Sequence, residues 1–200
     1  MPASTTTPTP APTPAPANSG ATTTTALLVI DAQTEYLETA HRRDETIAAI
    51  NDLIGRARAA GAPVVYIQHD GGAEKVAWVG SAGWQFHPAL LPPAAGELIV
   101  RKPVSDAFAG TSLQAELDRL GVGRVVVTGI HTQFCVATTC RSAVATGYDV
   151  ILAADAHTTE DDGSRSAAEL VAHTHATLDG FAGEEHVVVV RPAVEITFGA

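Results

Sequence analysis

The sequence predicts an α/β fold, namely a three-layer α/β/α domain around a six-stranded, mainly parallel sheet. Short apolar runs recur along the chain, and segments with helical spacing of apolar residues separate them. The runs are continuously apolar rather than alternating, which is typical of parallel strands covered on both faces. A glycine precedes every run after the first, as expected where a helix ends in a glycine cap before the next strand begins. The expected strands are residues 27–30, 64–67, 98–100, 125–127, 150–152 and 187–190.

Three of the segments between these runs carry signals of helix ends. Asp44 is the expected cap of a first helix, which Gly61 ends. Thr111 and Gln114 form a capping-box pattern at the start of a second helix, and Ser164 is the expected start of a third. The side chains expected to share one face of each helix are Ile47, Ile50, Ile54 and Ala57, then Leu113, Leu117 and Leu120, then Leu170, Val171, Thr174 and Leu178.

Two further segments lack a helix or strand pattern. Residues 1–25 consist almost entirely of Thr, Pro and Ala, and we expect a disordered tail ahead of one domain formed by residues 26–200. Residues 69–96 are rich in glycine and proline and contain both tryptophans. A long loop within a compact domain is often functional, and its aromatic side chains favour a lid that faces a substrate.

Composition narrows the classes of function and partner. The chain has 22 acidic and 12 basic residues, a formal net charge of −10, and no basic cluster of the kind that binds nucleic acid. No apolar run is long enough to cross a membrane, and residues 1–25 have neither a basic residue nor an apolar stretch that would indicate a secretory signal. We therefore expect a cytoplasmic protein that acts on a small molecule, without a nucleic-acid partner or a membrane.

Polar side chains follow the predicted strands at their carboxyl ends. These ends share one edge of a parallel sheet, where α/β proteins bind ligands. Asp31, Lys102 and Cys135 supply the base, the cation and the nucleophile that covalent catalysis requires. Taken singly, Asp31 could cap a helix, Lys102 could be solvated and Cys135 could pack in the core, but their meeting at one edge favours a site. The full set is Asp31, His69, Asp70, Arg101, Lys102, His131, Cys135, Asp155 and His157.

Cys135 is the expected nucleophile. It follows a buried strand and a tight turn, and it lies in the first turn of a helix expected to start near Thr132. The free N–H groups at the start of a helix favour a thiolate over a thiol. Cys140 lies further along the same helix and points about 140° away, so the two cysteines should not pair and Cys140 is expected in the core.

Four segments resemble the isochorismatase-like cysteine hydrolases, a superfamily that includes nicotinamidases, N-carbamoylsarcosine amidases and streptothricin hydrolases. They read LLVIDAQ ahead of Tyr36, VRKPVSDAFAGT from Val100, TGIHTQFCV from Thr128, and GYDV from Gly147 running on to DAH. The resemblance covers residues 26–192. It implies a Rossmann-like hydrolase fold, a hydrolase activity without a cofactor, and a homo-oligomer, either a dimer or a tetramer.

The resemblance also assigns roles to the strand-end residues. Cys135 matches the nucleophile, Asp31 the general base and Lys102 the cation. The family has a non-proline cis peptide before the cysteine, which corresponds to Ile130–His131 and implies an oxyanion hole formed by the N–H groups of His131 and Cys135. The side chains expected to contact the substrate are those of Tyr36, Trp84, Phe108 and His131.

These roles predict cleavage of an amide- or lactam-type C–N bond in a small molecule, through a thioester on the enzyme. Two alternatives remain open. One is a vinyl-ether hydrolase of the isochorismatase type, which needs Asp31 but no cysteine. The other is a relative that binds a small molecule without catalysis.

We expect no metal. Nicotinamidases of the family hold one through an Asp-x-His pair after the second strand and a further histidine, whereas this chain has Gln68-His69-Asp70 and a separate His87. The remaining histidines have the positions of ordinary polar residues, with His157 at a strand end and His173 and His175 on a solvated helix.

Overall fold

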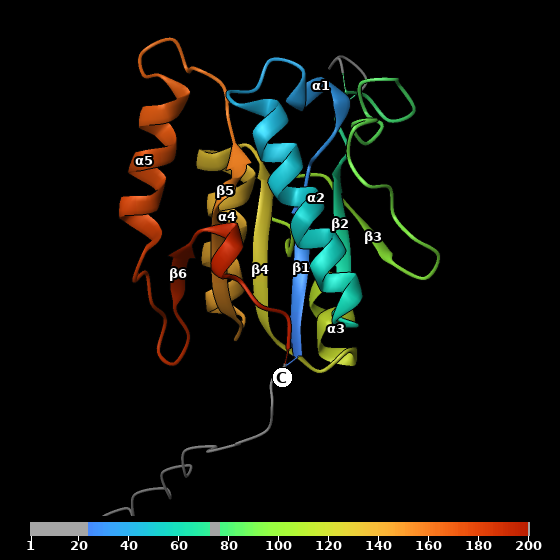
Figure 1. The fold of residues 1–200 in the computed structure, drawn as a ribbon, viewed down its shortest axis with the longest axis vertical. Helices are drawn as coiled ribbons and strands as arrows, with labels where there is room; N and C mark the ends of the chain where they lie inside the picture. The colour runs from blue at the N-terminus through green and yellow to red at the C-terminus, as the bar shows by residue number, and fades with distance from the viewer. Residues whose placement is uncertain (1–23, 73–76, 200) are drawn as a thin grey trace, which may run out of the picture.

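A computed structural model describes residues 24–72 and 77–199, and its sheet confirms the predicted architecture. Six parallel strands lie in the order β3-β2-β1-β4-β5-β6, between layers of helices (Figure 1). Each strand contains most or all of one predicted apolar run. The strands are β1 Thr24–Ile30, β2 Val64–His69, β3 Leu98–Lys102, β4 Val122–Ile130, β5 Asp149–Thr158 and β6 Val188–Arg191.

The first strand begins ahead of the predicted domain boundary at residue 26. Thr24 and Thr25 pair with β4, so these two residues belong to the sheet and not to the tail. The rest of the predicted tail, residues 1–23, lies outside the described residues. Within the described ranges, no helix combines the length and the apolar character that a membrane span requires.

The three helices predicted from their end signals and the one predicted near Thr132 are all present, and further short helical segments accompany them. Cys135 lies in a π-helical turn, η1, which leads directly into α4, so the predicted helix after β4 starts with a wider turn. The segments are α1 Thr34–Leu37, α2 Arg43–Ala59, α3 Leu113–Arg119, η1 Thr132–Val136, α4 Ala137–Ala145, α5 Ala167–Leu178 and the 3₁₀ turn η2 Ala193–Glu195.

The predicted helix caps were each wrong by one or two residues. Arg42 is the N-cap of α2, and Asp44 lies in the first turn, where Arg43 pairs with it. Ser112 is the N-cap of α3, although its side chain makes no capping hydrogen bond; the hydroxyl of Thr111 donates to the carbonyl of Ala107 and accepts from the N–H of Leu113.

For α5, the N-cap is Ser166. Its side chain accepts from the N–H of Glu169, whose carboxylate accepts from the N–H of Ser166, so the two complete a capping box. Ser164, the predicted start, is held in the preceding turn because its N–H and hydroxyl both donate to Asp162. The sequence thus located the helix, while a competing local hydrogen bond moved its start.

Apolar layers cover both faces of the sheet. On one face, Val125 and Val127 of β4 pack against α3 and α4, and Cys140 of α4 lies in this layer, fully buried as predicted. On the other face, Leu27 and Val29 of β1 pack against α2, which crosses in front of the sheet in Figure 1. Neighbouring residues of one strand therefore enter opposite cores, which explains why the strands read as continuously apolar.

The segment between β2 and β3 packs against the carboxyl ends of β1 and β2. Phe86 forms an antiparallel bridge with Gln33 and packs edge-on against Tyr66. The N–H of His87 donates to the carbonyl of Ala32. The described part of this segment therefore braces the edge of the sheet that carries the polar residues.

Candidate active site

Asp31, Lys102 and Cys135 meet at the carboxyl edge of the sheet. Asp31 follows β1 directly, Lys102 is the last residue of β3, and Cys135 lies in η1 after β4. The Nζ atom of Lys102 lies 2.7 Å from Oδ2 of Asp31 and donates to Sγ of Cys135 at 3.3 Å. Lys102 and Asp31 are 0% and 1% exposed, and Cys135 is 8% exposed. The structure thus joins the three strand-end residues that the sequence singled out.

Two further contacts fix the ammonium group of Lys102. It donates to the carbonyl of Val104 at 3.1 Å and lies 3.2 Å from Nδ1 of His69. A buried ammonium needs such partners, because burial without hydrogen bonds carries a large desolvation cost. His69 therefore belongs to the site, as the sequence indicated only by its position at the end of β2.

Burial sets the protonation of the pair around Lys102. Burial raises the pKa of Asp31 to about 6, although the charge of Lys102 and hydrogen bonds from Lys102 and Cys135 lower it in part. Burial and the nearby Asp31 charge raise the pKa of Cys135 to about 11, against the opposing effect of Lys102. Burial and the neighbouring anion thus favour the neutral thiol of Cys135, in the direction opposite to the thiolate predicted from the start of the helix.

A cavity of about 380 Å³ opens above these groups. Tyr36 and His131 both line it, with ring centroids 5.4 Å apart in an edge-on arrangement. Burial lowers the pKa of His131 and favours its neutral form. Phe134, which was not among the predicted substrate contacts, lies at the cavity with its side chain exposed to solvent. The full lining is Asp31, Tyr36, His69, Pro103, Val104, Ser105, His131, Phe134 and Cys135.

Two of the predicted substrate contacts lie elsewhere. Trp84 donates from Nε1 to Asp70 and lies under the guanidinium of Arg101, outside the cavity lining. Phe108 stacks on Tyr148 and packs with the core on the α4 side. Three lining residues that were not predicted could have been found from their positions beside catalytic candidates, since Val104 and Ser105 follow Lys102 closely and Phe134 precedes Cys135. Of the described residues of the predicted lid segment, 69–72 and 77–96, His69 at the end of β2 lines the cavity and Trp84 does not.

Gly129 allows β1 and β4 to approach closely beneath the site. It has a φ of +117°, and a Cβ atom on it would lie 1.9 Å from the carbonyl oxygen of Ile30. Asp31, the residue after Ile30, also has a positive φ of 51°, which is uncommon for a residue other than glycine. The Ile130–His131 peptide is cis. The backbone that carries Asp31 and Cys135 is therefore irregular on both strands.

Gln33 braces the ends of β1 and β2. Its side-chain Nε2 donates to the carbonyls of His69 and Trp84, and its Oε1 accepts from the N–H of His69 at 2.8 Å. The side chain is fully buried. These bonds fix the backbone of His69, whose ring contacts Lys102.

His69, Asp70 and His87, the residues compared above with the metal ligands of nicotinamidases, do not form a shared site. His69 lies at the site, whereas Asp70 pairs with Arg101 and His87 lies beside Glu38. Donor atoms of Asp31, His69 and Cys135 do lie within 4.8 Å of one another. Lys102 Nζ, however, lies 2.7 to 3.3 Å from an atom of each. A cation of the chain itself therefore already neutralises this donor set.

The buried histidine of β5 differs from its expected role. His157, predicted as an ordinary strand-end residue, is 3% exposed and contacts both Thr132 and His175. His175 is correspondingly half-buried rather than solvated, whereas His173 is exposed as expected. Helical spacing could have indicated this, since His175 lies one residue from the apolar face that Thr174 and Leu178 share.

Comparison with known proteins places these features in a family. The chain matches the isochorismatase domain over residues 25–179. It is 40% identical over 139 residues to a streptothricin hydrolase of Streptomyces noursei, covering 68% of this chain and 50% of that protein. It is 34% identical over 150 residues to the secreted isochorismatase effector Isc1 of Verticillium dahliae, covering 74% of this chain and 79% of that protein.

A solved structure agrees with these matches. The crystal structure of an isochorismatase from Pseudomonas putida KT2440 superposes with a TM-score of 0.78 at 30% identity, covering 86% of this chain and 89% of that one. The chain spans about half the length of the streptothricin hydrolases that it matches, at 50% and 55% of the two proteins. On the domain match, the sequence identity and the shared fold, the chain belongs to the isochorismatase family.

Proposed function

We propose that the chain is a cysteine hydrolase that cleaves a C–N bond of a small-molecule amide through a thioester on Cys135. The observation that carries the proposal is the contact of Lys102 with both Asp31 and Cys135, at 2.7 Å and 3.3 Å, on the floor of a cavity. A nucleophile, a base and a fixed cation within bonding reach are what covalent acyl transfer needs. The cavity volume of about 380 Å³ suits a small molecule.

In the first half of the reaction, Asp31 accepts the thiol proton as the sulfur of Cys135 attacks the carbonyl carbon. The raised pKa of Asp31, about 6, makes it a stronger base than an ordinary aspartate while leaving it mostly ionised at pH 7. Lys102 stabilises the negative charge that the sulfur gains in the transition state. The carbonyl π bond becomes an oxyanion, for which the N–H groups of His131 and Cys135 are the proposed donors, each worth about 3 kcal/mol in comparable sites.

Collapse of the tetrahedral intermediate breaks the C–N bond. The leaving nitrogen takes the proton from Asp31 and departs as ammonia or an amine, which leaves a thioester on Cys135. A water molecule then gives its proton to Asp31 and attacks the thioester carbon. The carboxylic acid leaves, and the sulfur of Cys135 regains a proton from Asp31, so that the site returns to its starting state. Tyr36 and His131 are the proposed side-chain contacts to the substrate.

The test is a comparison of the two cysteines. Cys135→Ala should abolish release of ammonia or amine from a panel of small amides, whereas Cys140→Ala, in the core away from the cavity, should retain it. Both variants are checked for folding by circular dichroism and thermal unfolding. Full amide hydrolysis by folded Cys135→Ala would refute the proposal.

A vinyl-ether substrate provides the second arm, because one similar protein is named an isochorismatase effector. Cleavage of isochorismate by Cys135→Ala, with loss of that activity in Asp31→Asn, would favour the vinyl-ether alternative. An unreactive Cys135 and no turnover of either substrate class would favour binding without catalysis. The carboxylate beside a thiol and an ammonium favours the cysteine reaction, because a vinyl-ether hydrolase has no use for the sulfur.

A further inference from the structure

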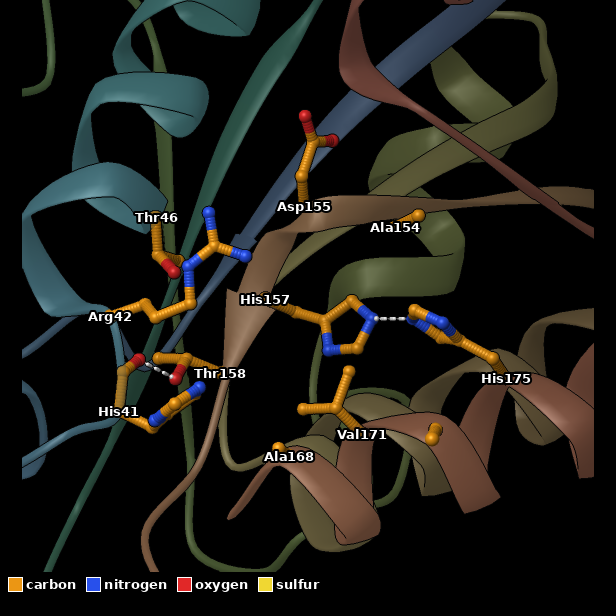
Figure 2. Close-up of a pocket in the computed structure, with 11 residues that line it drawn as sticks. His41, Arg42, Thr46, Ala154, Asp155, His157, Thr158, Ala168, Val171 and His175 are labelled. Carbon is orange, nitrogen blue, oxygen red and sulfur yellow. Dashed lines mark hydrogen bonds between the residues drawn. The ribbon is translucent and has the colours of Figure 1, made fainter.

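Three side chains form a hydrogen-bonded chain that runs from the turn of Cys135 to helix α5. Oγ1 of Thr132 lies 2.8 Å from Nδ1 of His157, and Nε2 of His157 lies 2.9 Å from Nε2 of His175. Figure 2 shows the second contact, with the His157 ring reaching from β5 towards α5. Thr132 is the first residue of η1, the turn that contains Cys135. The chain of contacts therefore ends on the backbone that carries the sulfur.

Because His157 is buried, each of its ring nitrogens depends on a hydrogen-bond partner within the protein. Thr132 is fully buried, and burial together with the nearby His175 lowers the pKa of His157 to about 3, so its ring is neutral at pH 7. A neutral imidazole donates through one nitrogen and accepts through the other. The direction of each hydrogen bond is therefore tied to that of the next, and loss of either end leaves a buried polar atom of His157 without a partner.

The outer end of the chain borders a second cavity, of about 210 Å³, between α2, β5 and α5. His175 is half-buried there, and Ala168 and Val171, from earlier turns of α5, line the same cavity (Figure 2). Because this cavity provides space, the side chain of His175 can be changed without crowding the core. The other charged and titratable groups that line this cavity are His41, Arg42 and Asp155, and Asp179, the C-cap of α5, acts electrostatically on His175.

We propose that His157 and His175 are positioning residues for the nucleophile, and that they act through Thr132 to hold η1 where Cys135 contacts Lys102. The inference rests on the proposed function of Cys135. The histidine pair lies outside the lining of the substrate cavity. Its loss should therefore lower kcat and the reactivity of the thiol while leaving KM nearly unchanged.

The experiment compares matched variants at each end of the chain. Thr132→Val keeps the shape of the side chain and removes the hydroxyl, and Thr132→Ser restores the hydroxyl. His175→Leu removes the outer imidazole, and His173→Leu makes the same change at an exposed histidine of the same helix. The readouts are kcat, KM and the second-order rate of alkylation of Cys135 by iodoacetamide, followed on the Cys135 peptide by mass spectrometry.

We expect Thr132→Val and His175→Leu each to slow alkylation and kcat about tenfold, which corresponds to about 1.4 kcal/mol. Thr132→Ser should recover most of the rate, and His173→Leu should behave as the unsubstituted protein. In the double variant Thr132→Val/His175→Leu, the rate should match that of the slower single variant, because both substitutions interrupt one chain. Multiplied single effects, or unchanged alkylation in folded variants, would overturn the proposal.

The experiment still gives an answer if one variant does not fold or if the proposed function fails. If Thr132→Val does not fold, His175→Leu and its rescue by His175→Gln, whose amide can still donate to His157, decide the question. If Cys135→Ala keeps full amide hydrolysis, the proposed function fails. The alkylation comparison still reports whether the histidine pair positions the thiol, because it needs no substrate.

Discussion

The ammonium of Lys102 lies 2.7 Å from the carboxylate of Asp31, and both side chains are almost completely buried. Such a pair is costly to desolvate and contributes little net stability compared with apolar packing. The pair therefore has a role other than stabilising the fold, and the contact of the same ammonium with Sγ of Cys135 indicates that this role is in the reaction. Lys102 therefore opposes the effect of burial on the pKa of both neighbours.

Removal of this cation should disable the site. Lys102→Met keeps the length of the side chain and removes the charge that lowers the pKa values of Asp31 and Cys135. We expect both pKa values to rise further and kcat/KM to fall by about 100-fold or more. Steady-state kinetics and the pH dependence of Cys135 alkylation measure the two effects.

The same substitution leaves the Asp31 carboxyl group buried without its ion-pair partner, so that it either stays charged and unpaired or must take up a proton, at a cost of up to about 3–5 kcal/mol. The double variant Asp31→Asn/Lys102→Met removes this titratable group and should regain part of the stability without regaining activity. Near-normal turnover by folded Lys102→Met would show that the cation is dispensable.

Activity should have an acid limb set by Asp31. Below a pKa of about 6, Asp31 is protonated and cannot accept the thiol proton. We therefore expect kcat/KM to fall by about tenfold per pH unit below pH 6 and to level off above it. The apparent value belongs to the Asp31–Cys135 pair rather than to one group. A pH–rate profile from pH 4.5 to 8 measures it, and a flat profile across that range would contradict the assignment of Asp31 as the base.

The sheet could be predicted because its central strands β1, β2 and β4 are largely buried on both faces, and such strands give continuous apolar runs like residues 125–127. The site could be predicted because parallel topology sends Asp31, Lys102 and Cys135 to one edge. Helix starts could not, because hydrogen bonds such as that between Ser164 and Asp162 compete over a few residues. Phe108 could not be assigned either, since one aromatic side chain suits a pocket or a core equally well.

The protonation states of Cys135 and His157 could not be predicted from the sequence either. The start of a helix suggested a thiolate for Cys135, but burial and the Asp31 charge are properties of the folded chain, and they reverse the sign of the shift. His157 shows the same limit, because it is buried and its partners Thr132 and His175 are distant from it in sequence. Motif residues are thus easier to locate than the charge states that they adopt.

Gln33 should matter more for stability than its neighbour in space, Gln68. Gln33 makes two bonds through Nε2 and accepts one from the His69 N–H, whereas Gln68 donates one bond to Trp84. We expect Gln33→Leu to cost about 2–4 kcal/mol and Gln68→Leu about half of that, because each buried partner loses its hydrogen bond. Urea unfolding measures the difference. Equal losses in the two variants would argue against a bracing role for Gln33.

Acid should destabilise the fold through His157. Its pKa is lowered from 6.5 to about 3 in the folded chain, so between these values the unfolded chain binds a proton that the folded chain does not. Stability from this group is therefore present above pH 6.5 and is lost as the pH falls, by about 2 kcal/mol at pH 5. Urea unfolding at pH 7 and pH 5 should give a smaller difference for His157→Gln than for the unsubstituted chain. His173→Gln, at an exposed position, is the control that should leave the difference unchanged.

Gly129 provides a test of the backbone beneath the site. An alanine there would place Cβ 1.9 Å from the carbonyl oxygen of Ile30 at a φ of +117°, so either β1 or β4 must shift. We expect Gly129→Ala to cost about 3 kcal/mol or more and to lower kcat, because Ile30 directly precedes Asp31. The matched control is Gly55→Ala in helix α2, where a Cβ meets nothing within 4 Å. That change should stabilise the fold by up to about 1 kcal/mol, since alanine favours helix. Chemical denaturation and kcat for both variants decide the matter, and a Gly129→Ala protein as stable and active as the Gly55→Ala protein would contradict the close approach of the two strands.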